Sequence, residues 1–86
     1  MTHIEFFPFH NRHIKFRLRN GQELHGVLLD MMDYNNKKVH TEYIFIPTER
    51  MREWKEADTA GNVVLKQQLQ SIIDIENIES AELLNF

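Results

Sequence analysis

The clearest pattern in the chain is the alternation of apolar and basic residues in "HIKFRLRNG". A period of two is that of a β-strand with one buried face, here the face of Ile14, Phe16 and Leu18. Asn20-Gly21 follows at once and is a strong hairpin signal, because both central positions of a type I′ turn need a positive φ. The pattern therefore predicts two antiparallel strands joined by a type I′ turn.

Two further strands follow. The return strand, "QELHGVLLD", has Gly26 in its middle, which we interpret as a bend that lets a short sheet curl. The third strand, "KVHTEYIFIP", is β-branched and aromatic and ends at Pro47. Its apolar residues fall on both faces at the far end, so we expect another layer to cover the second face.

After this strand the period becomes helical. Met51, Trp54 and Ala57 recur at helical spacing, with Thr48 as the predicted N-cap and Gly61 as the predicted stop. This segment predicts a first helix.

The next segment, "NVVLKQQLQSI", predicts a second helix capped by Asn62, with Leu65, Leu69 and Ile72 on one side. Together the two helices form a predicted hairpin over about residues 48–70. The alternative is that "NVVLKQQ" is a strand.

The chain closes with "IIDIENIESAELL", which predicts a short strand, a tight turn through Glu76-Asn77-Ile78, and a last strand with Ala81 and Leu83 inward. The expected fold is mainly β with an α insertion. It is one domain of residues 1–86: a five-stranded, strongly bent, partly open SH3-like barrel with the helical hairpin between strands 3 and 4. Open edges of such a barrel are natural places for a neighbouring subunit to pair.

Composition supports a single folded domain. Of its 86 residues, 42% are hydrophobic and 27% charged, which are ordinary values. A domain this small has little surplus stability, so oligomerisation is an attractive way to bury apolar surface. The lack of cysteine excludes disulfides, thiolate metal sites and a cysteine nucleophile. With no signal peptide and no apolar run long enough for a membrane span, we expect a cytoplasmic protein without membrane contact.

Charge is unevenly placed along the chain. The formal net charge is −3, and residues 61–86 carry one basic residue, Lys66, against four acidic ones. A protein that works mainly through phosphate contacts is expected to have at least one basic face. The first strand is the segment that could supply such a face.

The stretch "NGQELHGVLLDMMDYNNKKV" resembles the first motif of the Sm-like (LSm) family. Gly21 and Gly26 match the two glycines of that motif, and Asp33-Tyr34 match its acidic–aromatic pair. Asn36 matches the asparagine that helps to hold a base in the family. The resemblance implies a bent five-stranded SH3-like barrel and a tendency to form rings.

The resemblance covers about residues 12–46 and departs from the family elsewhere. The second motif, an Arg-Gly pair that lines the nucleotide pocket, should lie near "SIIDIENI", which has neither residue. The connection between strands 3 and 4 is also longer than is usual in the family. The resemblance therefore implies the fold and ring assembly, with a degenerate nucleotide pocket.

The sharpest binding candidates are Asp33, Tyr34 and Asn36, since an aromatic ring and an amide at one loop could stack on and hydrogen-bond an unpaired base. Turn chemistry alone also explains Asp and Asn at this place, and we favour that interpretation.

A second candidate is the basic stripe, which we define as Lys15, Arg17 and Arg19 on the outward face of the first strand. It could meet phosphates, or it could be the solvated face of an amphipathic strand, and the acidic C-terminal segment is a competing partner for it.

Aromatic residues mark candidate interfaces. Phe6, Phe7 and Phe9 around Pro8 are too apolar to face water, so they plug one end of the barrel or contact another subunit. Met51 and Trp54 on the insertion either cover their own sheet, which is the commoner case, or form an interface.

We expect neither catalysis nor a cofactor. The sequence has no Gly-rich phosphate loop and no recognisable nucleophile motif. The five histidines lack carboxylate or cysteine partners at ligand spacing, so we predict no metal site.

The first functional hypothesis is a non-catalytic assembly or protein-interaction module that forms a homo-oligomer, for which the resemblance to the Sm-like family implies a ring. The alternative is an RNA-binding ring that uses the loop around Asn36 and the basic stripe. A metalloprotein or small enzyme is a third, weaker alternative.

Overall fold

The computed structural model describes residues 1–30 and 41–84 of the chain. The predicted residues Asp33, Tyr34 and Asn36 lie outside the described residues. The elements, in chain order, are α1 (His3–Phe6), the 3-10 helix η1 (Phe7–Phe9), β1 (His13–Leu18), β2 (Glu23–Asp30), β3 (Glu42–Pro47), η2 (Thr48–Arg50), α2 (Met51–Thr59), α3 (Val63–Leu69), β4 (Ser71–Asp74), η3 (Ile75–Asn77) and β5 (Ile78–Leu83).

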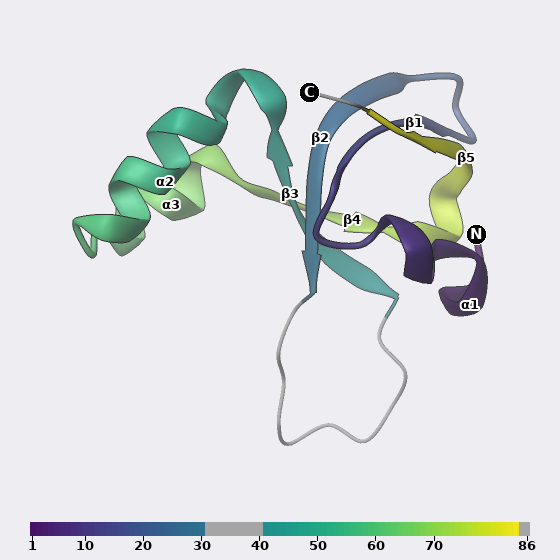
Figure 1. Ribbon diagram of the computed structural model, residues 1–86, viewed down its shortest axis with the longest axis horizontal. Coiled ribbons are helices and arrows are strands. Elements are labelled where there is room, and N and C mark those ends of the chain that lie inside the picture. Colours follow the sequence, from purple (N-terminus) through teal and green to yellow (C-terminus); the bar gives the residue numbers. More distant parts are fainter. Residues whose placement is uncertain (31–40, 85–86) are drawn as a thin grey trace.

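The strands form one antiparallel sheet of five strands in the order β4-β3-β2-β1-β5 (Figure 1). The mainly-β fold and the helical insertion between the third and fourth strands are thus confirmed. β4 bonds only to β3, and β5 only to β1, among the strands of the described residues. The sheet is therefore curved but not closed, and it keeps two free edges.

The β1–β2 hairpin forms where predicted, but its turn is not type I′. Asn11 is the one non-glycine residue with positive φ in the described ranges, so Asn20 does not take the conformation that this turn needs. Instead Gly21 N–H donates to the Leu18 carbonyl at 2.9 Å, and Gly21 itself takes a φ of 91°. This is the pattern of a three-residue loop that ends in a left-handed glycine. The Asn20 side chain stabilises it by accepting from Gln22 N–H at 2.9 Å.

Gly26 allows β2 and β3 to approach closely. A Cβ at this position would lie 2.3 Å from the Ile46 carbonyl oxygen and 2.6 Å from a ring carbon of Phe45. Any side chain would force the two strands apart. The glycine inside the strand pattern therefore marks a close contact between strands.

The core lies on one face of the curved sheet. Alternate residues of the strands point into it, as the period of two predicts for Ile14 and Phe16 on β1. The buried cluster consists of Phe6, Ile14, Phe16, Leu28, Tyr43, Phe45, Ile75 and Ile78.

The helical hairpin, formed by α2 and α3, is confirmed, and the alternative of a strand at "NVVLKQQ" is wrong. The Asn62 side chain accepts from Leu65 N–H at 3.1 Å and so caps α3 as predicted. Gly61 stops α2 with a φ of 69°. Thr48 is not the cap, because it lies inside η2 and α2 begins after Arg50 with no side-chain cap.

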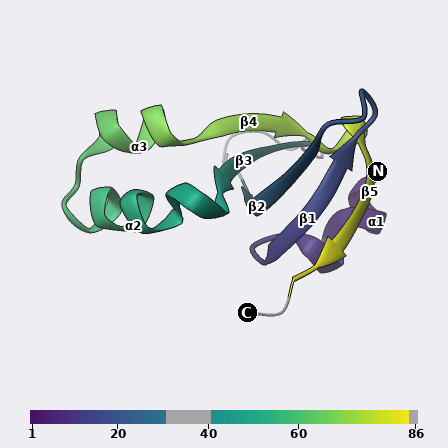
Figure 2. The same ribbon diagram turned by 90° about the horizontal axis from the view of Figure 1, so that it is seen from above.

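The same helical hairpin covers part of the second face of the sheet. Val27 and Ile46, which alternate with core residues on β2 and β3, are 6% and 0% exposed on that side. This confirms the expected second layer. Figure 2 shows that α2 and α3 lie side by side and that their far end projects beyond the strands.

The end of the chain forms a strand, a 3-10 turn and a strand, close to the prediction. Ile75 and Ile78, on either side of the turn, are fully buried. Two predictions fail here, the placement of Ile72 on one side of the second helix and the inward position of Leu83. Ile72 belongs to β4 rather than to the helix and is 49% exposed, and Leu83 on β5 is 39% exposed. Both strands are at sheet edges, where no further element covers these side chains.

Candidate interaction surfaces

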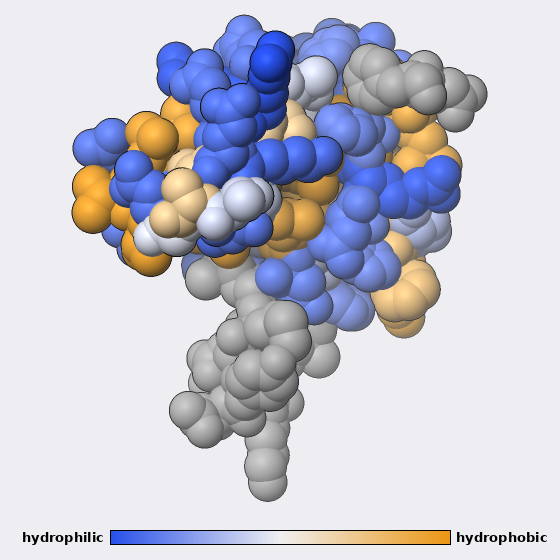
Figure 3. Space-filling model, turned by 60° about the vertical axis from the view of Figure 1, so that its left-hand side comes forward, coloured by the Kyte–Doolittle hydropathy of each residue, from blue (hydrophilic) through white to orange (hydrophobic). Residues whose placement is uncertain are grey.

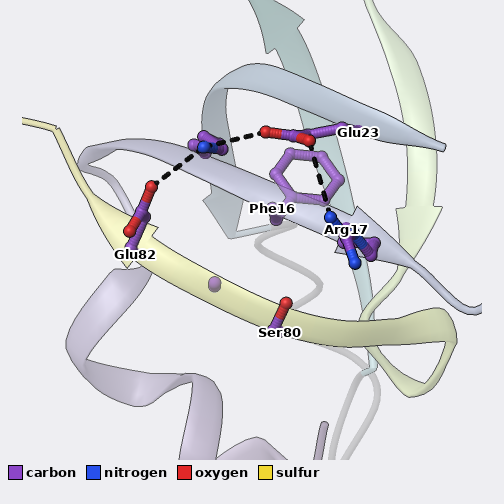
Figure 4. Close-up of a pocket in the computed structure, with 7 residues that line it drawn as sticks. Phe16, Arg17, Glu23, Ser80 and Glu82 are labelled. Atoms are coloured by element: carbon purple, nitrogen blue, oxygen red, sulfur yellow. Dashed lines mark ion pairs between the residues drawn. The ribbon is translucent and has the colours of Figure 1, made fainter. Parts of the chain in front are cut away.

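The basic stripe lies on the outer face of β1, as predicted, but carboxylates of neighbouring strands already pair with it. Lys15 Nζ is 2.9 Å from Glu23 Oε1 on β2 and 3.3 Å from Glu82 Oε1 on β5. Arg17 is 3.8 Å from the other oxygen of Glu23. Figure 4 shows these pairs around a shallow cavity of about 290 Å³. The competing acidic partner is thus found within the chain, at Glu82.

Strand register explains why these charges meet. Lys15 stands directly opposite Glu82, and Arg17 directly opposite Glu23, in the two ladders that flank β1. Opposite residues of antiparallel strands have neighbouring side chains, so unlike charges at these positions stabilise the pairing. The outer face of β1 therefore carries compensated charge.

The pairing shifts the titration of both partners in the direction expected of an ion pair. The hydrogen bond that Lys15 donates to Glu23, followed by the one that it donates to Glu82, raises the pKa of Lys15 above its usual value of 10.5. The hydrogen bond from Lys15 lowers the pKa of Glu23 below its usual 4.5. Both groups are thus held in their charged forms around neutral pH.

Arg19 also has an internal role. Its Nε donates to the main-chain carbonyl of Glu76 at 2.8 Å, and its own N–H donates to the Asn77 carbonyl at 2.8 Å. These bonds fasten the β1–β2 turn to η3. All three members of the basic stripe are therefore used within the fold.

The aromatic cluster at the N-terminus is divided between core and surface. Phe6 is fully buried and packs edge-on against Tyr43, with ring centroids 4.7 Å apart. Phe9 packs partly against the same core, which agrees with the predicted plug. Phe7 is 63% exposed, so it remains a candidate for contact with another molecule.

Met51 and Trp54 cover their own sheet in part and border an open cleft. The cleft holds about 240 Å³ between α2 and the second face of the sheet. It is lined by Asn11, Arg12, His13, Val27, Leu29, Ile46, Met51, Trp54 and Lys55. The indole Nε1 donates to Gln70 Oε1 at 3.0 Å, and Lys66 Nζ lies 4.8 Å from the ring centroid. Trp54 is therefore fixed by α3 on one side and borders the cleft with the rest of its ring.

The exposed large apolar side chains of the described residues lie on the two edge strands, at the start of α3, and on α1 and η1. β4 and β5 carry one each, α3 carries two, and α1 and η1 carry one each. The 3-10 helix η1 contacts β5. Figure 3 shows hydrophobic side chains at the free end of the helical hairpin, among hydrophilic ones. The exposed large apolar residues are Ile72 on β4, Leu83 on β5, Val63 and Val64 on α3, Ile4 on α1 and Phe7 on η1.

Sequence patterns missed several of these residues. Arg12 and Lys55 carry no motif, and only the fold brings them to one cleft. The helix α1 did have a readable signal, because Thr2 and Glu5 form a capping box in which each side chain accepts from the other residue's N–H.

No group of three or more histidine, cysteine or acidic side chains that could hold a metal ion occurs in residues 1–30 and 41–84. In the same part of the chain, none of the helices is long and apolar enough to cross a membrane.

No family model, curated protein or solved structure matches this chain.

Proposed function

We propose that the chain is a non-catalytic, Sm-like assembly module whose copies join head to tail through the free edges of β4 and β5. The observation that carries this proposal is that both edges lack a strand partner among the described residues and that each edge strand carries a large exposed apolar side chain, Ile72 on β4 and Leu83 on β5. Unpaired edge strands template pairing with another chain unless they are covered.

A head-to-tail contact suits this surface better than a symmetric one. A two-fold dimer through one edge would leave the other edge and its apolar side chains in water. A contact between the β4 side of one copy and the β5 side of the next covers both, and such heterologous contacts close into rings when the rotation permits. The Sm-like first motif supports the same conclusion, because that family implies ring assembly.

RNA binding is not part of this proposal. Lys15 and Arg17 are paired with carboxylates, and the net charge is −3, so little cationic surface is left on the outer face of β1 for phosphates. Asp33, Tyr34 and Asn36, on which the RNA hypothesis depends, lie outside the described residues, and RNA binding by them stays a prediction.

Light scattering tests the proposal through two edge variants. We expect wild-type protein to have a mass of several chains of 10.3 kDa, and Ile72→Lys and Leu83→Lys each to fall apart, because a charge at either edge opposes burial. Glu53→Lys on the exposed side of α2 is the control and should assemble normally.

Mixing the two edge variants tests the head-to-tail arrangement. The Ile72→Lys copy keeps an intact β5 side, and the Leu83→Lys copy keeps an intact β4 side. One good interface then remains, so the mixture should form dimers of twice the 10.3 kDa chain mass. A symmetric contact predicts no such complementation, and a monomeric wild-type protein would remove the proposal altogether.

A further inference from the structure

Four Lys and Arg side chains of the described residues form no ion pair there, Arg12, Arg19, Arg50 and Lys55, and two of them line one cleft. Lys15, Arg17, Arg52 and Lys66 each lie within 4.0 Å of a carboxylate, whereas Arg12 and Lys55 form no ion pair with any residue of the described ranges. Both are exposed, and both line the cleft between α2 and the sheet. Positive charge that no carboxylate of the described residues neutralises is thus located at this cleft.

The cleft arises from the directions in which side chains leave β2 and α2. Val27 and Leu29 on β2 point away from the core residue Leu28 and form its floor. Met51 and Lys55 are four residues apart on α2, so they face the same side and form one wall. The result is an apolar floor with a basic rim, and none of the lining residues is acidic.

The aromatic wall is held in place before any ligand arrives. Trp54 Nε1 donates to Gln70, and Lys66 lies over the ring while it also bonds Asp58 at 2.7 Å. The indole therefore offers an apolar surface with its one donor already satisfied. A wall fixed in this way loses little conformational freedom on binding, which favours affinity.

We propose that this cleft binds an acidic peptide segment of a partner protein, with one bulky apolar side chain on the floor and flanking carboxylates at Arg12 and Lys55. At 240 Å³ the cleft is smaller than the roughly 300–1,000 Å³ of small-molecule pockets and is open to solvent, which suits one anchoring side chain. The positive rim complements acidic neighbours of that anchor. None of the residues that line the cleft belongs to β4 or β5, so this proposal does not depend on self-assembly.

Trp54 is the only tryptophan of the chain and borders the cleft, so its fluorescence reports binding directly. The probe is the acetylated and amidated peptide Glu-Glu-Phe-Glu-Glu, with Leu and Met versions at the central position. We expect a saturable change in Trp54 emission that weakens with added salt. The Gly version and the Lys-Lys-Phe-Lys-Lys peptide should bind at least about tenfold more weakly, because each lacks one half of the recognition.

Charge reversal at Arg12 and Lys55 tests whether the peptide binds at the cleft. Arg12→Glu and Lys55→Glu should each weaken the Phe peptide by about tenfold. Arg52→Glu is the matched control, since Arg52 lies on the same helix but outside the cleft, and it should bind like wild type. Circular dichroism checks that the variants are folded. Ile72→Lys should bind the peptide normally, which separates this test from that of assembly.

Four results of the peptide and phenylacetate titrations would overturn the proposal. They are no response to any of the three anchored peptides, equal binding of the Gly peptide, equal binding by Lys55→Glu, and phenylacetate binding as tightly as the peptides, which would make the cleft a small-molecule site. A response of Trp54 to U-rich RNA without a response to the peptides would also overturn it.

Discussion

Lys15 on β1 and Glu23 on β2 form an ion pair with 2.9 Å between Nζ and Oε1, across the first hairpin of the sheet (Figure 4). The pair decides how the outer face of β1 is understood. Three basic residues at alternate positions suggest a surface for phosphates, yet the register of the neighbouring strands places carboxylates against Lys15 and Arg17. The pair therefore contributes to the sheet before it could serve a ligand.

The first prediction follows from the titration of this pair. Because the folded pKa of Glu23 is lowered, its contribution to stability is present above its unfolded pKa and is lost as the pH falls through the lower folded value. The raised pKa of Lys15 gives the opposite limit, with stability lost as the pH rises past 10.5 through the folded value. Glu23→Gln should therefore destabilise the fold slightly near neutral pH and have no effect in strong acid.

Urea unfolding of wild type and Glu23→Gln at neutral and acidic pH checks this dependence. The effect is small because both side chains are more than a third exposed and the pair is screened by solvent. Glu79→Gln, an exposed change on β5 with no ion pair in the described residues, serves as the control and should show no pH-dependent difference. A difference between wild type and Glu23→Gln that is equal at both pH values would contradict the ion-pair explanation.

A second prediction concerns the contact between Gly26 and Ile46. Gly26→Ala should lower the free energy of unfolding by about 1–3 kcal/mol, because the new methyl group would lie 2.3 Å from a main-chain oxygen that cannot turn away. Chemical denaturation measures this cost. Gly61→Asn is the matched control, since Gly61 has open space around it and asparagine tolerates its positive φ. Equal effects of the two substitutions would show that the close approach is not responsible.

A third prediction tests the cap of α3. Asn62→Ala should cost about 1 kcal/mol, because the Leu65 N–H would lose its acceptor at the first turn of a seven-residue helix. Asn62→Asp keeps a side-chain oxygen at the same place and should restore most of the stability. Thermal unfolding followed by far-UV circular dichroism compares the three proteins. A loss in Asn62→Asp as large as in Asn62→Ala would rule out capping as the cause.

The parts of the fold that the sequence predicts well are those set by local pattern. The alternation around Phe16 determines a strand face, and Gly61 with Asn62 marks the break between two helices, because these effects depend on residues close in the chain. The type of a turn is harder to predict from local pattern. Asn20-Gly21 is compatible with two loop types, and the Asn20 side-chain bond to Gln22 favours the longer one.

The parts that escape prediction depend on distant contacts. Leu83 continues the alternation of its strand, but β5 is an edge strand of the described sheet, and Leu83 stays 39% exposed there. Arg12 and Lys55 are far apart in sequence and meet only because α2 folds back over the sheet. Pattern gives the direction of a side chain, whereas its burial and its partners depend on what the rest of the chain places there.

A fourth prediction distinguishes two neighbouring phenylalanines that composition alone treats alike. Phe6→Ala should cost about 3–5 kcal/mol, because Phe6 is fully buried against Tyr43 and its removal leaves a cavity. Phe7→Ala should change the stability of the single chain little, since Phe7 is 63% exposed. Unfolding in urea at low protein concentration measures both. Comparable losses of stability in the two variants would mean that the Phe7 ring is buried in the folded protein under these conditions.

The last prediction addresses the alternative of an RNA-binding ring. Because the cations on β1 are paired and the chain is acidic overall, short U-rich and A-rich RNAs should bind no more tightly than the roughly 10⁻⁴–10⁻⁶ M of non-specific contacts at physiological salt. Filter binding measures these affinities, and Lys15→Met should leave them unchanged, since Lys15 is already paired with Glu23. The opposite result would be tight binding that weakens with salt and with Asn36→Ala. That result would place a base at the loop after β2 and make RNA, rather than protein, the partner to explain.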